Sequence, residues 1–311
     1  MERTSPLPPV VAGALVFPFP PMTGGGRHSV PPRARKRFGQ HFLVDVEAIG
    51  RISALCHPRR GELLLEVGPG RGALTRQLLA HGHYTVAVEI DRDLVGLLSS
   101  QLRERQFRLI QGDVLDLDFR QLLEEEGKEK LLVVGNLPYN ISAPFLFKLL
   151  ENADLISRSV LTLQREVASR IAARPGSRTY GLLSVLLGIR AESRVCLELG
   201  SRAFRPRPKV ESSVVELKFG ELRCPLGYPA AFQPVVRAAF AQRRKMLHNA
   251  LGGLWRGMKP PTCSRDDWPA LETVVAGIDL SRRAETLSVE EFAHLSDAMA
   301  RVAAQQSTES R

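Results

Sequence analysis

Short apolar segments alternate with amphipathic ones along most of this chain, and this alternation limits its fold more than any other feature. Four apolar segments have the length and branching of buried parallel strands: Leu63–Val67, Thr85–Ile90, Phe107–Gln111 and Leu131–Gly135. The segments Leu74–Ala80 and Leu94–Leu102 between them are predicted to be helices. The pattern predicts an α/β fold built on a mostly parallel, Rossmann-like sheet.

The alternation of strand-like and helix-like segments continues to about residue 220 and is then replaced by helical segments. We predict strands at Val160–Gln164, Val195–Leu199 and Ser213–Phe219, and a helix at Glu166–Ala173. From about Glu221 the pattern is helical, as in Val235–Leu251, and a final helix starts with a capping box of Ser288 and Glu291. We therefore predict a sheet domain over residues 35–220 and a small all-α domain over residues 221–305, with a short tail at 306–311.

Residues 1–34 have a different composition from the rest of the chain. They contain repeated prolines and the run Gly24-Gly25-Gly26, and such a segment cannot bury enough surface to offset its ordering entropy. We expect a flexible extension. An organelle transit peptide and a translation start at Met22 are the alternatives, since Glu2 is the only acid before Asp45.

Composition favours a soluble protein with an acidic partner. The formal charge of +10 and the sequence pI of about 9.9 are typical of proteins that bind nucleic acid or an anionic membrane surface. No run of about 18 apolar residues is present, so no membrane span is expected. The four cysteines are widely separated, which indicates neither a disulfide framework nor a metal site. A reducing cytoplasm is the expected location.

A glycine-rich turn follows the first predicted strand. Gly68, Gly70 and Ala73 satisfy the G-x-G-x-x-A pattern of dinucleotide sites, in which a ligand lies against bare backbone at a helix N-terminus. Glu89, at the end of the second strand, can accept hydrogen bonds from ribose hydroxyls, and Asp113, after the third, can accept from an adenine amine. These residues fit any adenosine ligand, so a nicotinamide dehydrogenase is the alternative.

The tetrapeptide Asn136-Leu137-Pro138-Tyr139 follows the fourth strand and favours S-adenosylmethionine-dependent methylation of an amino group. Asn136 Oδ1 and the Leu137 carbonyl can each accept one hydrogen of an adenine N6, while Pro138 restricts Leu137 to extended conformations. Tyr139 can stack on the base. Phe204, in a proline-rich loop, is the candidate for the opposite face of a base taken out of its stack, and an ordinary core phenylalanine is the alternative. The next helix is predicted to have Ser142 as N-cap and Pro144 in its first turn. This chemistry needs no metal.

Three basic clusters point to a nucleic-acid substrate. Arg205, Arg207 and Lys209 lie in a stretch without acids, and Arg243-Arg244-Lys245 is predicted to lie on a helix that also carries Arg237. Arg35-Lys36-Arg37 is the third. Each cluster is either a solvated face or a phosphate contact, and a base-methylating site favours the second interpretation.

Together these motifs resemble the small-subunit ribosomal RNA adenine dimethyltransferases, the KsgA family, over about residues 35–300. The matching stretches are Arg37–Leu43, Glu66–Gly72, Glu89–Asp91, Gly112–Asp113, Gly135–Ser142, Phe204–Val210 and Arg243–Leu247. The resemblance implies transfer of two methyl groups to N6 of each of two adjacent adenines in the 3′-terminal hairpin of small-subunit rRNA, late in assembly. It also implies that His41 and Leu43 line the cofactor pocket with Gly68, Glu89, Asp113 and Asn136.

Two rivals accompany this hypothesis. One is the large-subunit rRNA methyltransferase that confers macrolide resistance, although Arg243–Leu247 followed by Asn249-Ala250-Leu251 fits the KsgA tail better. The other is an assembly factor whose main role is to bind the immature subunit. Residues 175–181 form a loop that is either a mobile cover over a site or a plain connector. A monomer is expected.

Overall fold

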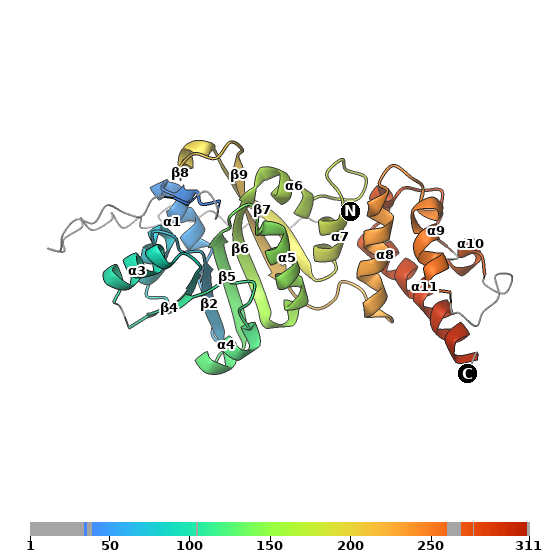
Figure 1. Ribbon diagram of the computed structural model, residues 1–311, viewed down its shortest axis with the longest axis horizontal. Helices are drawn as coiled ribbons and strands as arrows, with labels where there is room; N and C mark the ends of the chain where they lie inside the picture. The colour runs from blue at the N-terminus through green and yellow to red at the C-terminus, as the bar shows by residue number, and fades with distance from the viewer. Residues whose placement is uncertain (1–33, 36–38, 104, 260–268, 276, 310–311) are drawn as a thin grey trace, which may run out of the picture. The chain divides into compact units, whose positions relative to one another are not determined.

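The computed structural model describes residues 34–35, 39–103, 105–259, 269–275 and 277–309 (Figure 1). The predicted N-terminal extension therefore lies almost entirely outside the described residues. The chain divides into two compact units: residues 1–145, 159–163 and 199–214 form unit 1, and residues 146–158, 164–198 and 215–311 form unit 2. This division interleaves along the sequence, and the domains predicted at 35–220 and 221–305 stay a prediction.

The predicted α/β fold with C-terminal helices is confirmed. The strands are β1 (Phe42–Leu43), β2 (Glu62–Val67), β3 (Thr85–Glu89), β4 (Phe107–Gln111), β5 (Lys130–Asn136), β6 (Ile156–Gln164), β7 (Ala191–Leu199), β8 (Phe204–Arg205) and β9 (Ser212–Phe219). Seven of them form one sheet in the order β4-β3-β2-β5-β6-β9-β7, while β1 and β8 form a separate pair. In the part built from β2 to β5 all neighbouring strands are parallel.

The helices of the first half are α1 (Val46–Ala54), α2 (Ala73–Ala80), α3 (Arg92–Gln101), α4 (Phe119–Glu126), α5 (Ser142–Glu151) and α6 (Arg165–Ile171). Helix α3 packs beside β3 and β4 at one edge of the sheet (Figure 1). Helix α5 begins at Ser142 itself, so Ser142 is its first residue and the predicted N-cap is one position too late. The Ser142 hydroxyl instead donates to the Pro138 carbonyl at 3.2 Å.

The register of the parallel strands aligns their carboxyl ends. Val67 of β2 lies opposite both Val88 of β3 and Gly135 of β5, and Glu89 of β3 lies opposite Gln111. A Cβ at Gly135 would lie 2.8 Å from the Val67 carbonyl oxygen, closer than any side chain tolerates. Glycine at this position therefore lets the end of β5, with the residues that follow it, sit directly against the end of β2.

A two-stranded antiparallel pair joins the segment before α1 to a segment much later in the chain. Phe42 lies opposite Arg205 and Leu43 opposite Phe204. The Val44 and Asp45 amides both donate to the Ala203 carbonyl, at 2.8 and 3.3 Å. Helix α1 begins directly afterwards, with Asp45 as its N-cap. The segment before α1 is thus fixed by backbone hydrogen bonds, and it contributes residues to the pocket described below.

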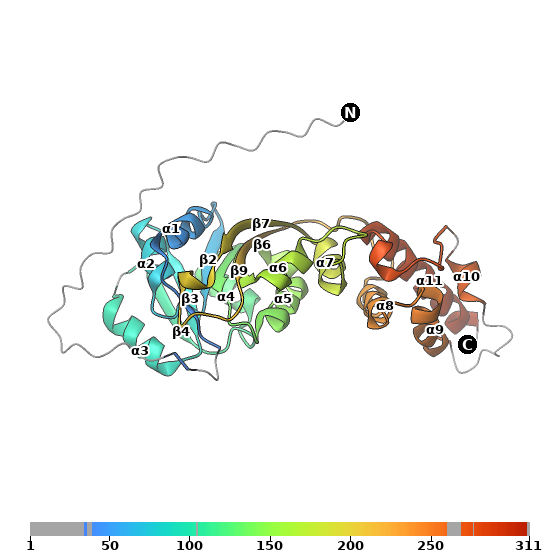
Figure 2. The ribbon, with the colours of Figure 1, turned by 90° about the horizontal axis from the view of Figure 1, so that it is seen from above.

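Unit 2 contains the remaining helices: α7 (Leu182–Gly188), α8 (Pro229–Ala241), α9 (Leu247–Gly257), α10 (Leu271–Val274) and α11 (Val289–Glu309). Helix α8 packs against both α9 and α11 (Figure 2), around a core that includes Tyr180, Phe232, Trp255 and Phe292. None of the helices in the described part of the chain is long and apolar enough to cross a membrane.

The helical pattern over Val235–Leu251 is interrupted, and the prediction that Arg243-Arg244-Lys245 lies on one helix with Arg237 is wrong. The structure has two helices there, α8 and α9, interrupted at residues 242–246. Met246 forms an antiparallel bridge with Arg283, and the Leu247 amide donates to the Arg282 carbonyl at 2.9 Å. These tertiary backbone contacts outweigh local helix propensity. The capping box is confirmed, because the Ser288 amide donates to Glu291 at 2.7 Å and the Glu291 amide donates to Ser288 Oγ at 3.1 Å.

Candidate functional site

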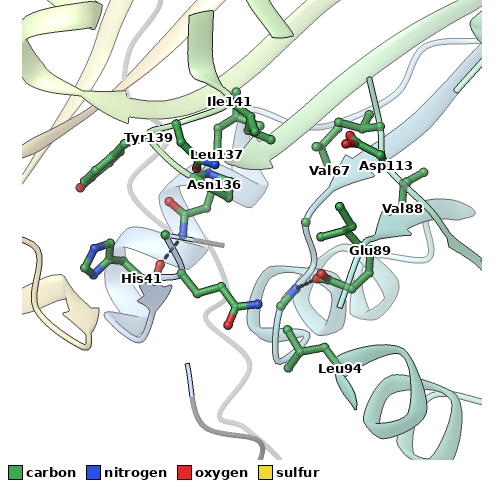
Figure 3. Close-up of a pocket in the computed structure, with 18 of the residues that line it drawn as sticks. His41, Val67, Val88, Glu89, Leu94, Asp113, Asn136, Leu137, Tyr139 and Ile141 are labelled. Carbon is green, nitrogen blue, oxygen red and sulfur yellow. Dashed lines mark hydrogen bonds between the residues drawn. The ribbon is translucent and has the colours of Figure 1, made fainter. Parts of the chain in front are cut away.

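A pocket opens at the carboxyl ends of β2 to β5, entirely within unit 1 (Figure 3). It is lined by residues 39–42 of the N-terminal segment, by Val67, Gly68 and Gly70, by Val88 to Ile90 and Leu94, by Gly112 to Val114, and by Asn136 to Ile141. This is the edge of an open α/β sheet at which ligands bind. Of the residues proposed from sequence, the pocket brings together His41, Gly68, Gly70, Glu89, Asp113 and the whole Asn136–Tyr139 tetrapeptide.

Glu89 is the most constrained acid of the pocket. Its carboxylate accepts hydrogen bonds from the Gly70 amide at 3.1 Å and from the Asp91 amide at 2.9 Å. The residue is 5% exposed, and burial raises the pKa of Glu89 above its ordinary value. Gly70 has φ +60°, and a Cβ there would lie 3.0 Å from the Phe42 ring. The glycine turn and the carboxylate therefore hold each other in place.

Asp113 lines the pocket just after β4. Its Oδ1 accepts from the Leu115 amide at 2.9 Å, which fixes the carboxylate at the end of β4. Gly68 and Gly112 also line the pocket, and a Cβ at either would meet no atom within 4 Å. Two acids at neighbouring strand ends, with glycines in the same lining, suit the ribose and base of an adenosine group.

The Asn136 side chain has a defined orientation. Its Nδ2 donates to the His41 carbonyl at 2.7 Å (Figure 3). An amide group carries its donor and its acceptor on different atoms, so this contact leaves Oδ1 as the acceptor of Asn136. The neighbouring Leu137 amide donates to the Thr162 carbonyl at 3.2 Å, which attaches the tetrapeptide to β6.

Tyr139 is held at both ends of its side chain. Its hydroxyl forms a hydrogen bond with Ser212 Oγ at 3.0 Å. Its ring stacks on His41, with centroids 5.6 Å apart and an interplanar angle of 29°, and His41 Nδ1 lies 2.8 Å from the Pro206 carbonyl. Hydrogen bonds therefore restrain both aromatic rings at this end of the pocket.

Two of the residues proposed from sequence do not line the pocket. Leu43 is 7% exposed and Phe204 is 1% exposed, and both belong to the β1–β8 pair. In this arrangement the Phe204 ring is covered, so its stacking on a base stays a prediction that the geometry does not support directly. Leu43 contributes through the backbone pairing that fixes the segment before α1.

The proposed RNA-binding residues fall into two groups. Arg205, Arg207, Lys209, Arg244 and Lys245 are exposed. Arg243 is half-buried and hydrogen bonded within unit 2. Of the third basic cluster, Arg35 forms ion pairs with Asp91 and Asp93, while Lys36 and Arg37 lie outside the described residues.

Sequence reasoning missed two residues that support the site. Gln40 Nε2 donates to Asp91 at 3.1 Å and its Oε1 accepts from the Arg35 amide at 2.8 Å, which anchors the segment at the pocket entrance. A signal for Gln40 existed, since it lies inside the stretch Arg37–Leu43. Ser212 had no such signal, because it is 73 residues from its partner Tyr139.

The pocket fits S-adenosylmethionine by the chemistry of its donors and acceptors. The buried Glu89 carboxylate suits vicinal ribose hydroxyls, and the glycine backbone leaves space for the ligand. The acceptor Asn136 Oδ1 lies at the far end, beside two aromatic rings (Figure 3). A flat base bound beside Asn136 and the two aromatic rings could donate from its amino group to Oδ1 and stack on an aromatic face.

Glu66 of β2 gives a prediction about pH. It is 2% exposed, and burial, reinforced by the charge of Glu89, raises its pKa from 4.5 to about 7. An acid whose pKa is higher in the folded than in the unfolded state favours folding at a pH below its unfolded pKa. This contribution to stability is lost as the pH rises from 4.5 to about 7. Glu66→Gln should therefore raise the free energy of unfolding at pH 8 by up to about 3 kcal/mol, with a much smaller increase at pH 5. Denaturant unfolding at both pH values tests this, and equal effects at both would contradict it.

Comparison with known proteins identifies the family of the chain. The family model described as ribosomal RNA adenine dimethylase matches residues 32–299. Curated relatives named ribosomal RNA small subunit methyltransferase A include one from Geobacter sulfurreducens, 45% identical over 85% of this chain and 94% of the relative. Another, from Pseudomonas aeruginosa, is 43% identical over 86% of this chain and 95% of the relative.

Two solved structures share the fold at lower identity. The dimethyladenosine transferase from Plasmodium falciparum has a TM-score of 0.68 at 22% identity, covering 82% of this chain and 96% of its own. The 23S rRNA methyltransferase ErmE has a TM-score of 0.61 at 23% identity, covering 83% of this chain and 99% of its own. These two likenesses support the fold, whereas the family model and the curated relatives cover nearly the whole described chain. The chain belongs to the ribosomal RNA adenine dimethylase family.

Proposed function

We propose that this protein dimethylates N6 of two adjacent adenines in the 3′-terminal hairpin of small-subunit rRNA, late in assembly of the subunit. The methyl donor of the family is S-adenosylmethionine. One observation carries the proposal to this chain's own residues: Glu89, Asp113 and the Asn136–Tyr139 tetrapeptide line a single pocket at adjoining strand ends. A nicotinamide dehydrogenase has no use for the last of these three elements.

The proposed chemistry depends on acceptors aimed at the adenine amine. The N6 lone pair is delocalised into the ring, so the amine is a poor nucleophile until its geometry becomes more tetrahedral. Asn136 Oδ1 and the Leu137 carbonyl each accept one N6 hydrogen, which draws the amine towards a tetrahedral geometry and localises the lone pair on N6. S-adenosylmethionine supplies an electrophilic methyl group on a sulfonium. The methylated amine then loses a proton readily, so a strong general base is not required.

The base is proposed to lie against Tyr139. Stacking of a base on an aromatic ring contributes about 1 to 3 kcal/mol, and the bond between the Tyr139 hydroxyl and Ser212 Oγ holds that ring at one angle. A base removed from its helix loses its stacking there, and Tyr139 restores part of it. The second face of the base is assigned to Phe204 by the sequence, as a prediction.

The substrate is proposed to be RNA within a particle, because the formal charge of +10 suits a polyanion. Arg244 and Lys245 are both exposed. Replacing both by alanine should weaken binding to unmethylated small ribosomal subunits and reduce the slope of log affinity against log salt by about 1 to 2. Filter binding at several salt concentrations measures this. A slope equal to that of the wild type would make the pair an ordinary solvated face.

Methyl transfer from labelled S-adenosylmethionine to small subunits that lack the modification tests the proposal, with product nucleosides identified by mass spectrometry. Dimethyladenosine at adjacent positions is the expected product. Transfer only to naked large-subunit rRNA would favour the resistance methyltransferase. Cofactor binding without transfer to either RNA would favour an assembly factor.

We further propose that the protein acts as a monomer in the cytoplasm, where ribosomal subunits mature.

A further inference from the structure

The loop between α6 and α7, residues 172–181, is firmly attached to unit 2 at its base. Tyr180 is 1% exposed and belongs to the helical core, where its ring meets Phe240 at 6.2 Å. Ser184 Oγ accepts from the Gly181 amide at 3.0 Å and donates to the Arg170 carbonyl at 2.5 Å. These contacts fix the two ends of the loop. The conformation of the residues between them depends on the contacts of the loop tip.

Two charged residues from elsewhere in unit 2 hold that tip. The Gly176 amide donates to the Glu285 carbonyl at 2.7 Å. Arg243 donates through Nε to the Glu285 carboxylate at 2.6 Å and through Nη2 to the Arg178 carbonyl, also at 2.6 Å. The Arg243 guanidinium therefore joins the 284–286 turn to the loop, and two of its three nitrogens are occupied by contacts within the protein.

The loop so held presents positive charge. Arg174 and Arg178 are exposed, and residues 172–181 contain no acid. The nearest acid in the contacts described is Glu285, whose charge is neutralised by Arg243. Exposed arginines on a fixed backbone suit phosphate groups, because their donors match phosphate geometry and little ordering entropy is lost on binding.

We infer that the loop tip, residues 174–179, contacts rRNA phosphates through Arg174 and Arg178, and that Arg243 is a positioning residue which holds this loop in its binding conformation. The inference rests on the proposed function. The sequence grouped Arg243 with Arg244 and Lys245 as direct RNA contacts. In this inference Arg244 and Lys245 contact the substrate, whereas Arg243 acts through the loop.

Removal of the Glu285 side chain distinguishes a positioning role of Arg243 from a purely electrostatic one. If Arg243 acts only as a free positive charge, removal of the neighbouring acid makes the surface more positive and RNA binding equal or tighter. If Arg243 positions the loop, removal of Glu285 releases the guanidinium and weakens RNA binding. The pair is partly exposed, with side-chain exposures of 41% and 28%, so its loss should have little effect on global stability.

The experiment compares Glu285→Ala with Glu221→Ala, a control that removes an exposed acid of unit 2. Hydrogen exchange of the free protein, followed by mass spectrometry, measures mobility of residues 174–180. Affinity for unmethylated small ribosomal subunits is measured at several salt concentrations. For Glu285→Ala we expect faster exchange in the loop and affinity lower by about three- to tenfold, as for loss of a charge-assisted hydrogen bond, while Glu221→Ala resembles the wild type.

Arg243→Lys provides a second, independent variant, since lysine keeps the charge and loses the fork that reaches two acceptors. We expect it to reproduce the loop mobility and the weaker binding of Glu285→Ala. Subunit binding by Glu285→Ala as tight as that of the wild type, or unchanged exchange in both variants, would overturn the inference. Failure of the wild-type protein to bind or methylate small subunits would instead defeat the proposed function itself.

Discussion

Replacing Asn136 by alanine is expected to lower kcat for methyl transfer by about 10²- to 10³-fold, the loss typical of removing one fixed polar group from a reacting centre. The reason is geometric. Asn136 Nδ2 is bound to the His41 carbonyl at 2.7 Å, so Oδ1 is available to accept an N6 hydrogen. Single-turnover transfer to unmethylated small subunits measures the chemical step, and binding of the subunits should persist because Asn136 carries no phosphate contact.

Two further variants define the role of Asn136. Asn136→Asp keeps an acceptor at this position and should retain more activity than alanine, although it can no longer donate to His41. Asn152→Ala is the matched control, since Asn152 lies outside the pocket, in unit 2, and caps the end of α5 through the Lys148 carbonyl. Near-wild-type turnover by Asn136→Ala would remove Asn136 from the reacting centre.

Replacing Glu89 by alanine is expected to raise the Kd for S-adenosylmethionine by about 10²-fold, which corresponds to about 2.7 kcal/mol. The carboxylate is 5% exposed and accepts from the Gly70 and Asp91 amides. Its removal costs the proposed ribose contacts and also leaves two backbone donors without their acceptor. Titration calorimetry with S-adenosylmethionine measures the effect directly.

The control for Glu89 is Glu124→Ala, which removes an exposed acid of α4 outside the pocket. Glu89→Gln keeps the size of the side chain but presents one donor where the native group presents only acceptors, so we expect it to bind between the wild type and alanine. Thermal unfolding of each variant separates lost affinity from lost fold. An unchanged Kd for Glu89→Ala would place the ribose elsewhere.

Much of unit 1 was predictable because its signals are local. The branched apolar strands, the turn containing Gly68 and Gly70, and the acids at strand ends all lie within a few residues of the positions they define. The register of parallel strands then brings these strand ends together without further information. The tetrapeptide at 136–139 could be placed for the same reason, since it follows directly on β5.

The features that sequence reasoning missed depend on contacts between distant segments. The break between α8 and α9 follows from pairing of Met246 with Arg283, which no window of local propensity contains. The bond of Tyr139 to Ser212 and the attachment of Arg243 to Glu285 span 73 and 42 residues. The burial of Phe204 follows from the pairing of β8 with β1, which is why the local sequence left a stacking ring and a core ring both open.

The single hydrogen bond from Asn136 to the His41 carbonyl has a consequence for how the reaction ends. Because the His41 carbonyl holds Nδ2, Asn136 presents Oδ1 to the base in the proposed geometry, and a base with an oxygen in place of the amine, such as guanine or hypoxanthine, meets repulsion there. Adenine begins with two N6 hydrogens for two acceptors, and each methylation removes one. After the second, neither acceptor has a partner, and buried acceptors left unpaired disfavour the bound state. In the proposed geometry the number of N6 hydrogens thus sets the affinity: the base stays bound while a hydrogen remains, and the dimethylated product is released.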